Sequence, residues 1–190
     1  MVDEGGQRRD AVANRKAVID AAAELLSADS SAGMREIADR SGLGRSTVYR
    51  HFPTREALFR ALLREVIATS GSELEGLLGD EPGLEAGLCD TGDFLFRYGM
   101  RYRFLYSHRH DAAPMLNQVT HDPSSPLAEF LAVARARGEA RTDLPIAWLV
   151  CQYIALTIAL VGDVLAGRLE RVPAGGLLGD TFVAMTAARP

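Results

Sequence analysis

Residues 34–53 limit the fold of this chain more than any other segment. Their apolar positions recur at helical spacing and then stop at Gly42, which can adopt the left-handed conformation that ends a helix. A second short helical pattern follows, in which Val48 and Phe52 share one face. Pro53 ends this pattern, because proline lacks a backbone donor and disfavours a helical conformation in the residue before it. The spacing therefore predicts two short helices packed across a tight turn.

The second of these helices has a polar outer face. Segment 45–64 carries five arginines and one glutamate, although the whole chain has a net charge of −4. A local basic patch on an acidic protein is typical of a nucleic-acid-binding surface. A solvated helix face would give the same charges, so charge alone leaves both interpretations open. The positions predicted to point outward are Arg45, Ser46, Thr47, Arg50 and His51, with Tyr49 toward one edge.

The remaining periodicity is also helical. Apolar residues repeat three or four positions apart, and alternation of the strand type does not extend beyond a few residues. The fold class predicted is therefore all-α. Besides the two short helices, the patterns predict helices over 10–28, 55–78, 84–107, 127–137, 143–167 and 175–188, with a polar, proline-bearing loop over 108–126.

Composition excludes several other classes of protein. The first ten residues are polar and lack an apolar stretch, so we expect no secretory signal and an intracellular address. Cys89 and Cys151 have no neighbouring cysteine, which argues against a disulfide framework and against a thiolate zinc site. No nucleophile elbow, phosphate-binding loop or carboxylate pair stands in a recognisable frame, so an enzyme is not expected.

The residues around the turn resemble a known family. The run GLGRSTVYRHFPTREAL over 42–58, with Ile37-Ala38 before it and the apolar pattern of 19–26 upstream, is similar to the DNA-binding domain of the TetR (tetracycline repressor) family of bacterial transcriptional regulators. The resemblance covers roughly residues 9–65. The remainder agrees with the family only in length, helical character and order of elements.

This resemblance implies a cytoplasmic homodimeric repressor. Such a protein binds a palindromic operator in double-stranded DNA, needs no cofactor, and releases the DNA when a small-molecule effector enters its C-terminal half. The implied division is a helix-turn-helix domain over 1–54 and a helical ligand-binding and dimerisation domain over 55–190.

The resemblance also assigns roles to individual residues. Thr47 and Tyr49 match positions that usually contact phosphates or bases, and His51 matches a phosphate-contacting position. Arg45, Ser46 and Arg50 occupy the variable positions that usually set sequence choice. Arg55 stands where the family usually has a lysine near the DNA backbone, and its guanidinium would suit a phosphate.

Two positions depart from the family pattern. Ala32-Gly33 replaces the usual pair of hydroxyl residues, so a helix cap and a phosphate contact should be missing before the first short helix. Arg35 could supply the lost phosphate contact. Gly44 replaces the usual serine cap of the second short helix, a change that typically costs only a few tenths of a kcal/mol.

Residues 144–161 carry no charge over a length that could span a membrane. A membrane-anchored helical sensor is therefore an alternative function. Pro145, Gln152 and Thr157 interrupt the apolar run, and a helix that is apolar all round also arises between a core and a subunit interface. We expect the second arrangement, no membrane association, and a dimer interface formed by Leu149, Leu156, Leu160, Leu178, Phe182 and Met185.

Two further groups are candidate binding residues. Apolar walls with a few polar groups are typical of ligand pockets, although the same side chains could simply be core. A loop group of His108, His110 and His121 with Asp111 and Asp122 has metal-ligand residue types but no closed zinc spacing, so no metal site is predicted. The candidate effector pocket is formed by Phe94, Tyr98, Tyr102, Phe104, Trp148, Gln152 and Thr157.

Overall fold

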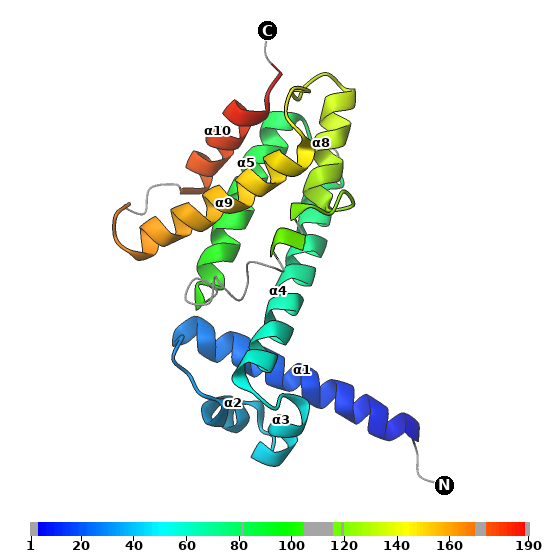
Figure 1. The fold of residues 1–190 in the computed structure, drawn as a ribbon, viewed down its shortest axis with the longest axis vertical. Coiled ribbons are helices and arrows are strands. Elements are labelled where there is room, and N and C mark those ends of the chain that lie inside the picture. The colour runs from blue at the N-terminus through cyan, green and yellow to red at the C-terminus, as the bar shows by residue number, and fades with distance from the viewer. Residues whose placement is uncertain (1–3, 81, 105–115, 119, 170–173, 189–190) are drawn as a thin grey trace. The chain divides into compact units, whose positions relative to one another are not determined.

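The computed structural model describes residues 4–80, 82–104, 116–118, 120–169 and 174–188 (Figure 1). Within these ranges all regular structure is helical, apart from one isolated bridge between Ala140 and Ala187. The all-α prediction is therefore confirmed. The helices are α1 (Glu4–Ala28), α2 (Met34–Ser41), α3 (Arg45–His51), α4 (Arg55–Leu78), α5 (Leu84–Arg101), α8 (Pro126–Ala136), α9 (Ile146–Leu165) and α10 (Ala174–Thr186).

The chain divides into two compact units, residues 1–66 and residues 67–190. The expected domain boundary lay at the start of α4, after residue 54. The internal contacts instead place the first half of α4 with the N-terminal unit. Leu58, Leu62 and Leu63 in this half are each 1% exposed or less. They bury apolar surface, which is the main favourable contribution to folding.

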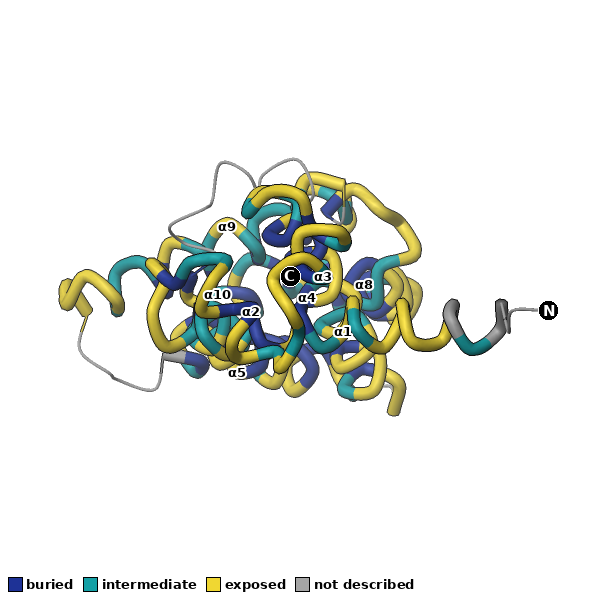
Figure 2. The backbone as a smooth tube through the Cα atoms, turned by 90° about the horizontal axis from the view of Figure 1, so that it is seen from below, coloured by how far each residue is buried: buried dark blue, intermediate teal, exposed yellow. Residues whose placement is uncertain are grey.

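The N-terminal unit packs α1, α2 and α3 on one another. Its core includes Val18 and Ala22 of α1, Ile37 of α2 and Val48 of α3, all fully buried. The residues of α1 from Arg9 to Ala13 are exposed, and this end of the helix is visible toward the N-terminus in Figure 2. The buried stripe of α1 therefore begins only with the apolar pattern that the sequence places after residue 17.

The C-terminal unit is built on one apolar core from α4, α5, α8, α9 and α10. Tyr153 of α9 lies at its centre with the ring of Phe182, the two ring centroids being 3.9 Å apart. The Tyr153 hydroxyl is hydrogen-bonded to the Thr186 hydroxyl, so its polar end is satisfied inside the core. Phe130 of α8 and Leu88 of α5 complete this layer.

Helices α5 and α10 approach very closely, and Figure 1 shows them side by side. A Cβ atom added to Gly92 of α5 would lie only 2.6 Å from the backbone nitrogen of Gly179 on α10. Side-chain carbons do not tolerate such a separation from backbone, so glycine is required where these two helices touch.

Candidate nucleic-acid interface

A glycine turn positions the second short helix against the first. Gly42 follows α2 with a φ of 70°, the left-handed conformation that glycine adopts without steric cost. The Ser41 hydroxyl donates to the carbonyl of Ala38 at 2.9 Å, which helps to satisfy the end of α2. Gly44 then begins α3, and its carbonyl accepts from the amides of Thr47 and Val48. The predicted two-helix arrangement is therefore present.

The outer face of α3 is polar and accessible. Val48 and Phe52 are buried at 0% and 3% exposure, so they anchor the helix. The opposite face of α3 points toward solvent. Arg45, Ser46, Tyr49 and Arg50 are exposed, with Tyr49 at 48%, while Thr47 and His51 are half-buried at the edges of the face. The predicted outward positions of Arg45, Ser46 and Arg50 are thus exposed, whereas Thr47 and His51 are only half-exposed and Tyr49, expected toward one edge, is exposed.

Two contacts from α1 hold the short helices in place. The guanidinium of Arg15 lies over the ring of Phe52, with Cζ 5.4 Å from the ring centroid. Arg40 of α2 forms an ion pair with Glu24 of α1. Sequence reasoning missed both contacts, because Arg15 and Phe52 lie 37 positions apart and no local pattern marks them as partners.

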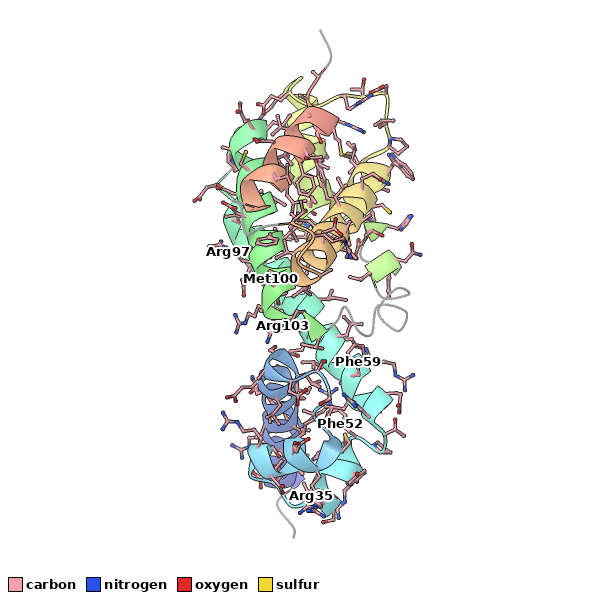
Figure 3. All side chains as sticks on the ribbon, turned by 90° about the vertical axis from the view of Figure 1, so that its left-hand side faces the viewer. Arg35, Phe52, Phe59, Arg97, Met100 and Arg103 are labelled. Atoms are coloured by element: carbon pink, nitrogen blue, oxygen red, sulfur yellow. The ribbon has the colours of Figure 1, made fainter. Side chains whose placement is uncertain are left out.

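The start of α2 shows the departure that the resemblance identified. Gly33 has no side chain with which to cap the helix. Instead its backbone N–H donates to the Glu36 carboxylate at 2.7 Å, which is one half of a capping box. Arg35 is exposed at the surface of the N-terminal unit, whereas Phe52 and Phe59 are buried within that unit (Figure 3).

Arg55 has a partner that the sequence did not indicate. Its side chain is half-buried, and Nη2 donates a hydrogen bond of 2.9 Å to the backbone carbonyl of Ser30. The resemblance implied a phosphate contact at this position. In the structure the guanidinium is bound to the α1–α2 connection.

The candidate effector residues fall into two groups. Phe94, Tyr98, Tyr102 and Phe104 form a continuous aromatic series in and after α5, with successive ring centroids 5.3, 4.7 and 6.2 Å apart. Burial raises the pKa of Tyr98 above its ordinary value. On α5 itself Arg97 is exposed and Met100 is half-buried (Figure 3).

The other three candidates lie on α9 in different environments. Trp148 is 53% exposed and Gln152 is half-buried, whereas Thr157 is buried and donates to the carbonyl of Tyr153 at 2.8 Å. An exposed Trp148 does not line an enclosed pocket within one protomer. Among the described residues of the C-terminal unit, one pocket of about 200 Å³ lies between Leu78 of α4 and Phe130 and Val133 of α8.

The predicted dimer interface needs correction. Leu149, Leu160, Leu178 and Phe182 are between 0 and 8% exposed within a single protomer, because they fill the core between α5, α9 and α10. They are therefore not available to a second chain. Leu156 and Met185 are half-buried, and the large exposed apolar side chains of this region are Trp148, Leu165, Leu169 and Leu177.

The histidine group is only partly within the described residues. His108, His110 and Asp111 lie outside them. His121 Nδ1 donates to the carbonyl of Asn117 at 2.8 Å, and the Asp122 carboxylate accepts from the Ser124 amide and hydroxyl. Both residues thus serve local turns, and among the residues that the structure describes no group of three His, Cys, Asp or Glu could hold a metal ion.

Helix α9, at Ile146–Leu165, is long and apolar enough to cross a membrane by length and composition, with a mean hydropathy of 1.8. One third of its apolar window is buried inside the protomer. Most of its other residues are half-buried among the described residues, and Trp148 and Leu165 are exposed. That observation agrees with the expected position between a core and a subunit interface, and composition alone would also allow a membrane.

The helix-turn-helix region matches a known family. Residues 18–62 match the sequence model of the bacterial regulatory proteins of the tetR family. Over 74 residues the chain is 38% identical to the HTH-type transcriptional repressor LfrR of Mycolicibacterium smegmatis. That match covers 39% of this chain and 37% of LfrR, so it spans little more than a third of this curated relative.

Solved structures resemble nearly the whole chain. The crystal structure of the TetR-like regulator LfrR from Mycobacterium smegmatis in complex with proflavine has a TM-score of 0.68 at 25% identity, covering 94% of this chain and 97% of that one. RolR in complex with resorcinol has a TM-score of 0.74 at 17% identity, covering 95% and 91%, which shows the fold. Residues 18–62 are therefore similar to the helix-turn-helix domain of the tetR family, and the fold of nearly the whole chain is similar to that of TetR-like regulators.

Proposed function

We propose that the protein is a transcriptional repressor that binds a palindromic operator in double-stranded DNA as a homodimer and releases it on binding a small-molecule effector. The observation that carries this proposal is the exposed polar face of α3, mounted on the buried side chains of Val48 and Phe52. A helix fixed in this way can enter the major groove without losing its anchor.

Residues of α3 have distinct roles in this proposal. Arg45, Ser46 and Arg50 are exposed and reach base edges, and an arginine that reads guanine bonds both O6 and N7. Thr47, Tyr49 and His51 contact the flanking phosphates, a role supported by the half-buried positions of Thr47 and His51 at the edges of the face. Phosphate contacts fix the orientation, and base contacts determine the sequence.

The proposed dimer uses the apolar residues that one protomer leaves uncovered. Trp148 and Leu165 of α9 and Leu177 of α10 are between 43 and 53% exposed. A second copy that covers them would bury apolar surface at roughly 25 cal/mol per Å². Because a two-fold dimer presents two identical helices α3, its operator is a palindrome. The protein then acts in the cytoplasm, where the DNA lies.

The effector in this proposal binds the C-terminal unit. Support comes from the aromatic series between Phe94 and Phe104 and from the structure of LfrR, which is in complex with proflavine. Helix α4 has residues in both compact units, so it is the segment through which a change in one reaches the other. An effector releases DNA only if it binds the DNA-free form more tightly, and the coupling is then reciprocal.

Capture of genomic DNA by the purified protein tests this function. We expect enrichment of a few fragments that share a palindrome, with half-site centres about 34–36 Å or a multiple of this distance apart. The matched control is the double variant Arg45→Ala/Arg50→Ala, which keeps the core of α3 and should enrich no palindrome. Equal recovery of all fragments by both proteins would contradict the proposal.

A further inference from the structure

The hydrogen bond from Arg55 to Ser30 joins residues 25 positions apart. Arg55 is the first residue of α4, and Ser30 lies in the connection between α1 and α2. A phosphate contact would require the guanidinium to point into solvent toward the DNA. Instead the half-buried side chain uses one of its donors, in a solvent-exposed hydrogen bond, to hold a carbonyl of the N-terminal unit.

The carbonyl that Arg55 binds is held in a well-defined turn. The Asp29 carboxylate accepts from the Ser31 amide at 2.8 Å and from the Ser31 hydroxyl at 2.7 Å. The amide of Ala32 donates back to the Asp29 carbonyl at 3.1 Å, and the Ala32 side chain is buried. The direction of the Ser30 carbonyl is therefore fixed before Arg55 binds it.

The N-terminus of α4 is already satisfied by its own side chains. The Thr54 hydroxyl accepts from the Ala57 amide at 3.1 Å. The Glu56 carboxylate accepts from its own amide and from the Thr54 hydroxyl, and these hydrogen bonds lower its pKa, so it is ionised at neutral pH. A DNA phosphate at this helix end would meet a negative charge where the helix dipole normally favours an anion.

We propose that Arg55 is a positioning residue that fastens α4 to the turn between α1 and α2, and that it does not contact DNA phosphate. This inference rests on the proposed function. Arg55 thus adds a contact from α4 to a turn that the Asp29–Ser31 hydrogen bonds already order. A displacement of α4 is then transmitted through Arg55 to the turn at 29–32 and to α2, and so to the helix that reads DNA.

The salt dependence of operator affinity separates the two roles. Each lost phosphate contact lowers the slope of log K against log salt concentration by about 0.9. Arg55→Met should weaken operator binding with a slope that matches that of Arg60→Met, an exposed arginine on the same helix that serves as the charge-matched control. A slope for Arg55→Met that is smaller in magnitude than that for Arg60→Met by about 0.9 would overturn the inference.

The acceptor side of the contact gives a second test. Asp29→Ala removes a negative charge, so long-range electrostatics alone would strengthen DNA binding. Loss of the turn should instead weaken it, and the double variant with Arg55→Met should be no weaker than either single variant, because the two residues act through one contact. Additive losses, or tighter binding by Asp29→Ala, would contradict the role.

Hydrogen exchange tests the contact without DNA. Loss of one hydrogen bond of about 1 kcal/mol should raise the exchange rates of the Ser31 and Ala32 amides about fivefold in Arg55→Met. Unchanged rates would overturn the inference even if the protein binds its operator. If these amides exchange faster in Arg55→Met but the unmodified protein captures no palindrome from genomic DNA, the contact is supported and the proposed function is contradicted.

Discussion

Helices α3 and α10 differ in how clearly their sequences separate a buried face from an exposed one. In α3, buried Val48 stands between Thr47 and exposed Tyr49, so polarity follows burial. In α10, Leu178 is 3% exposed, whereas its neighbour Leu177 is 53% exposed, and the two residues are chemically identical. A polar face on a short helix is therefore readable from sequence, while two apolar faces are indistinguishable until the packing is known.

This difference affects how function is assigned in each unit. On α3 the exposed residues are the candidate DNA contacts, and the same pattern that predicts the helix predicts them. On α9 and α10 the sequence predicts apolar character but not which residues are buried within a single protomer. The four interface residues placed wrongly, Leu149, Leu160, Leu178 and Phe182, were all core.

Aspartate at the two neighbouring leucines of α10 should give the largest contrast. Leu178→Asp places an unpaired charge in the core and should destabilise the fold by more than about 4 kcal/mol. Leu177→Asp should destabilise the folded protomer itself by less than about 0.5 kcal/mol, apart from the stability that the dimer contributes. It should nevertheless convert the proposed dimer into a monomer. Urea denaturation measures the first effect and sedimentation the second.

Equal destabilisation by the two aspartates would show that Leu177 is also buried. A Leu177→Asp protein that remains a dimer would place the subunit interface elsewhere.

Alanine should have opposite effects at two helical glycines. Gly92→Ala forces a Cβ against the backbone of Gly179 and should cost about 1–3 kcal/mol of stability. A Cβ added to Gly71 of α4 would have no neighbouring atom within 4 Å. Gly71→Ala should therefore stabilise the protein by up to about 1 kcal/mol through helix propensity. Thermal unfolding of both variants checks the signs. A stabilising Gly92→Ala would mean that α5 and α10 are not in close contact.

Removal of one arginine from α3 should affect recognition but not folding. Arg50→Ala should cost about 1–3 kcal/mol of operator binding and relax the preference at one or two base positions. Titration of the operator and of random DNA provides the measurement. If both weaken equally, Arg50 contacts phosphate and does not read a base. The unfolding midpoint should remain unchanged, because the side chain is exposed.

The smallest expected effect concerns two similar turns, one in each unit. Asp29 and Asp122 each accept from the amide and hydroxyl of the serine two positions later, which lowers the pKa of both carboxyls below 3.8. A lowered pKa means that these contacts stabilise the fold above about pH 4 and lose this contribution as the pH falls through the folded value. Ser31→Ala and Ser124→Ala should each raise the pKa of the partner aspartate in an NMR titration.

Only the turn of the N-terminal unit should influence DNA binding, since Arg55 binds its Ser30 carbonyl. Weaker operator binding by Ser124→Ala would therefore contradict the separate roles of the two turns.

The helices could be predicted from the spacing of apolar residues and from the glycine and proline residues that end helices. Gly42 and Pro53 fixed the ends of the short helices, and the structure confirms them. Other ends moved by a few residues: the pattern predicted a helix to about residue 107 where α5 ends at Arg101. Local residue types decide whether a helix forms, whereas its last turn depends on capping contacts that the pattern does not contain.

The amino-acid sequence by itself determined the all-α class, the helix-turn-helix and the exposure of Arg45, Ser46 and Arg50 on α3, because backbone conformation and polarity act over a few neighbouring positions. Tertiary structure alone decided that Arg55 binds Ser30, that Arg15 covers Phe52, and that Leu178 is core while Leu177 is exposed. These outcomes depend on which surfaces meet after distant segments pack. The free energy of that packing comes from contacts between residues far apart in the sequence, and no local pattern identifies such pairs.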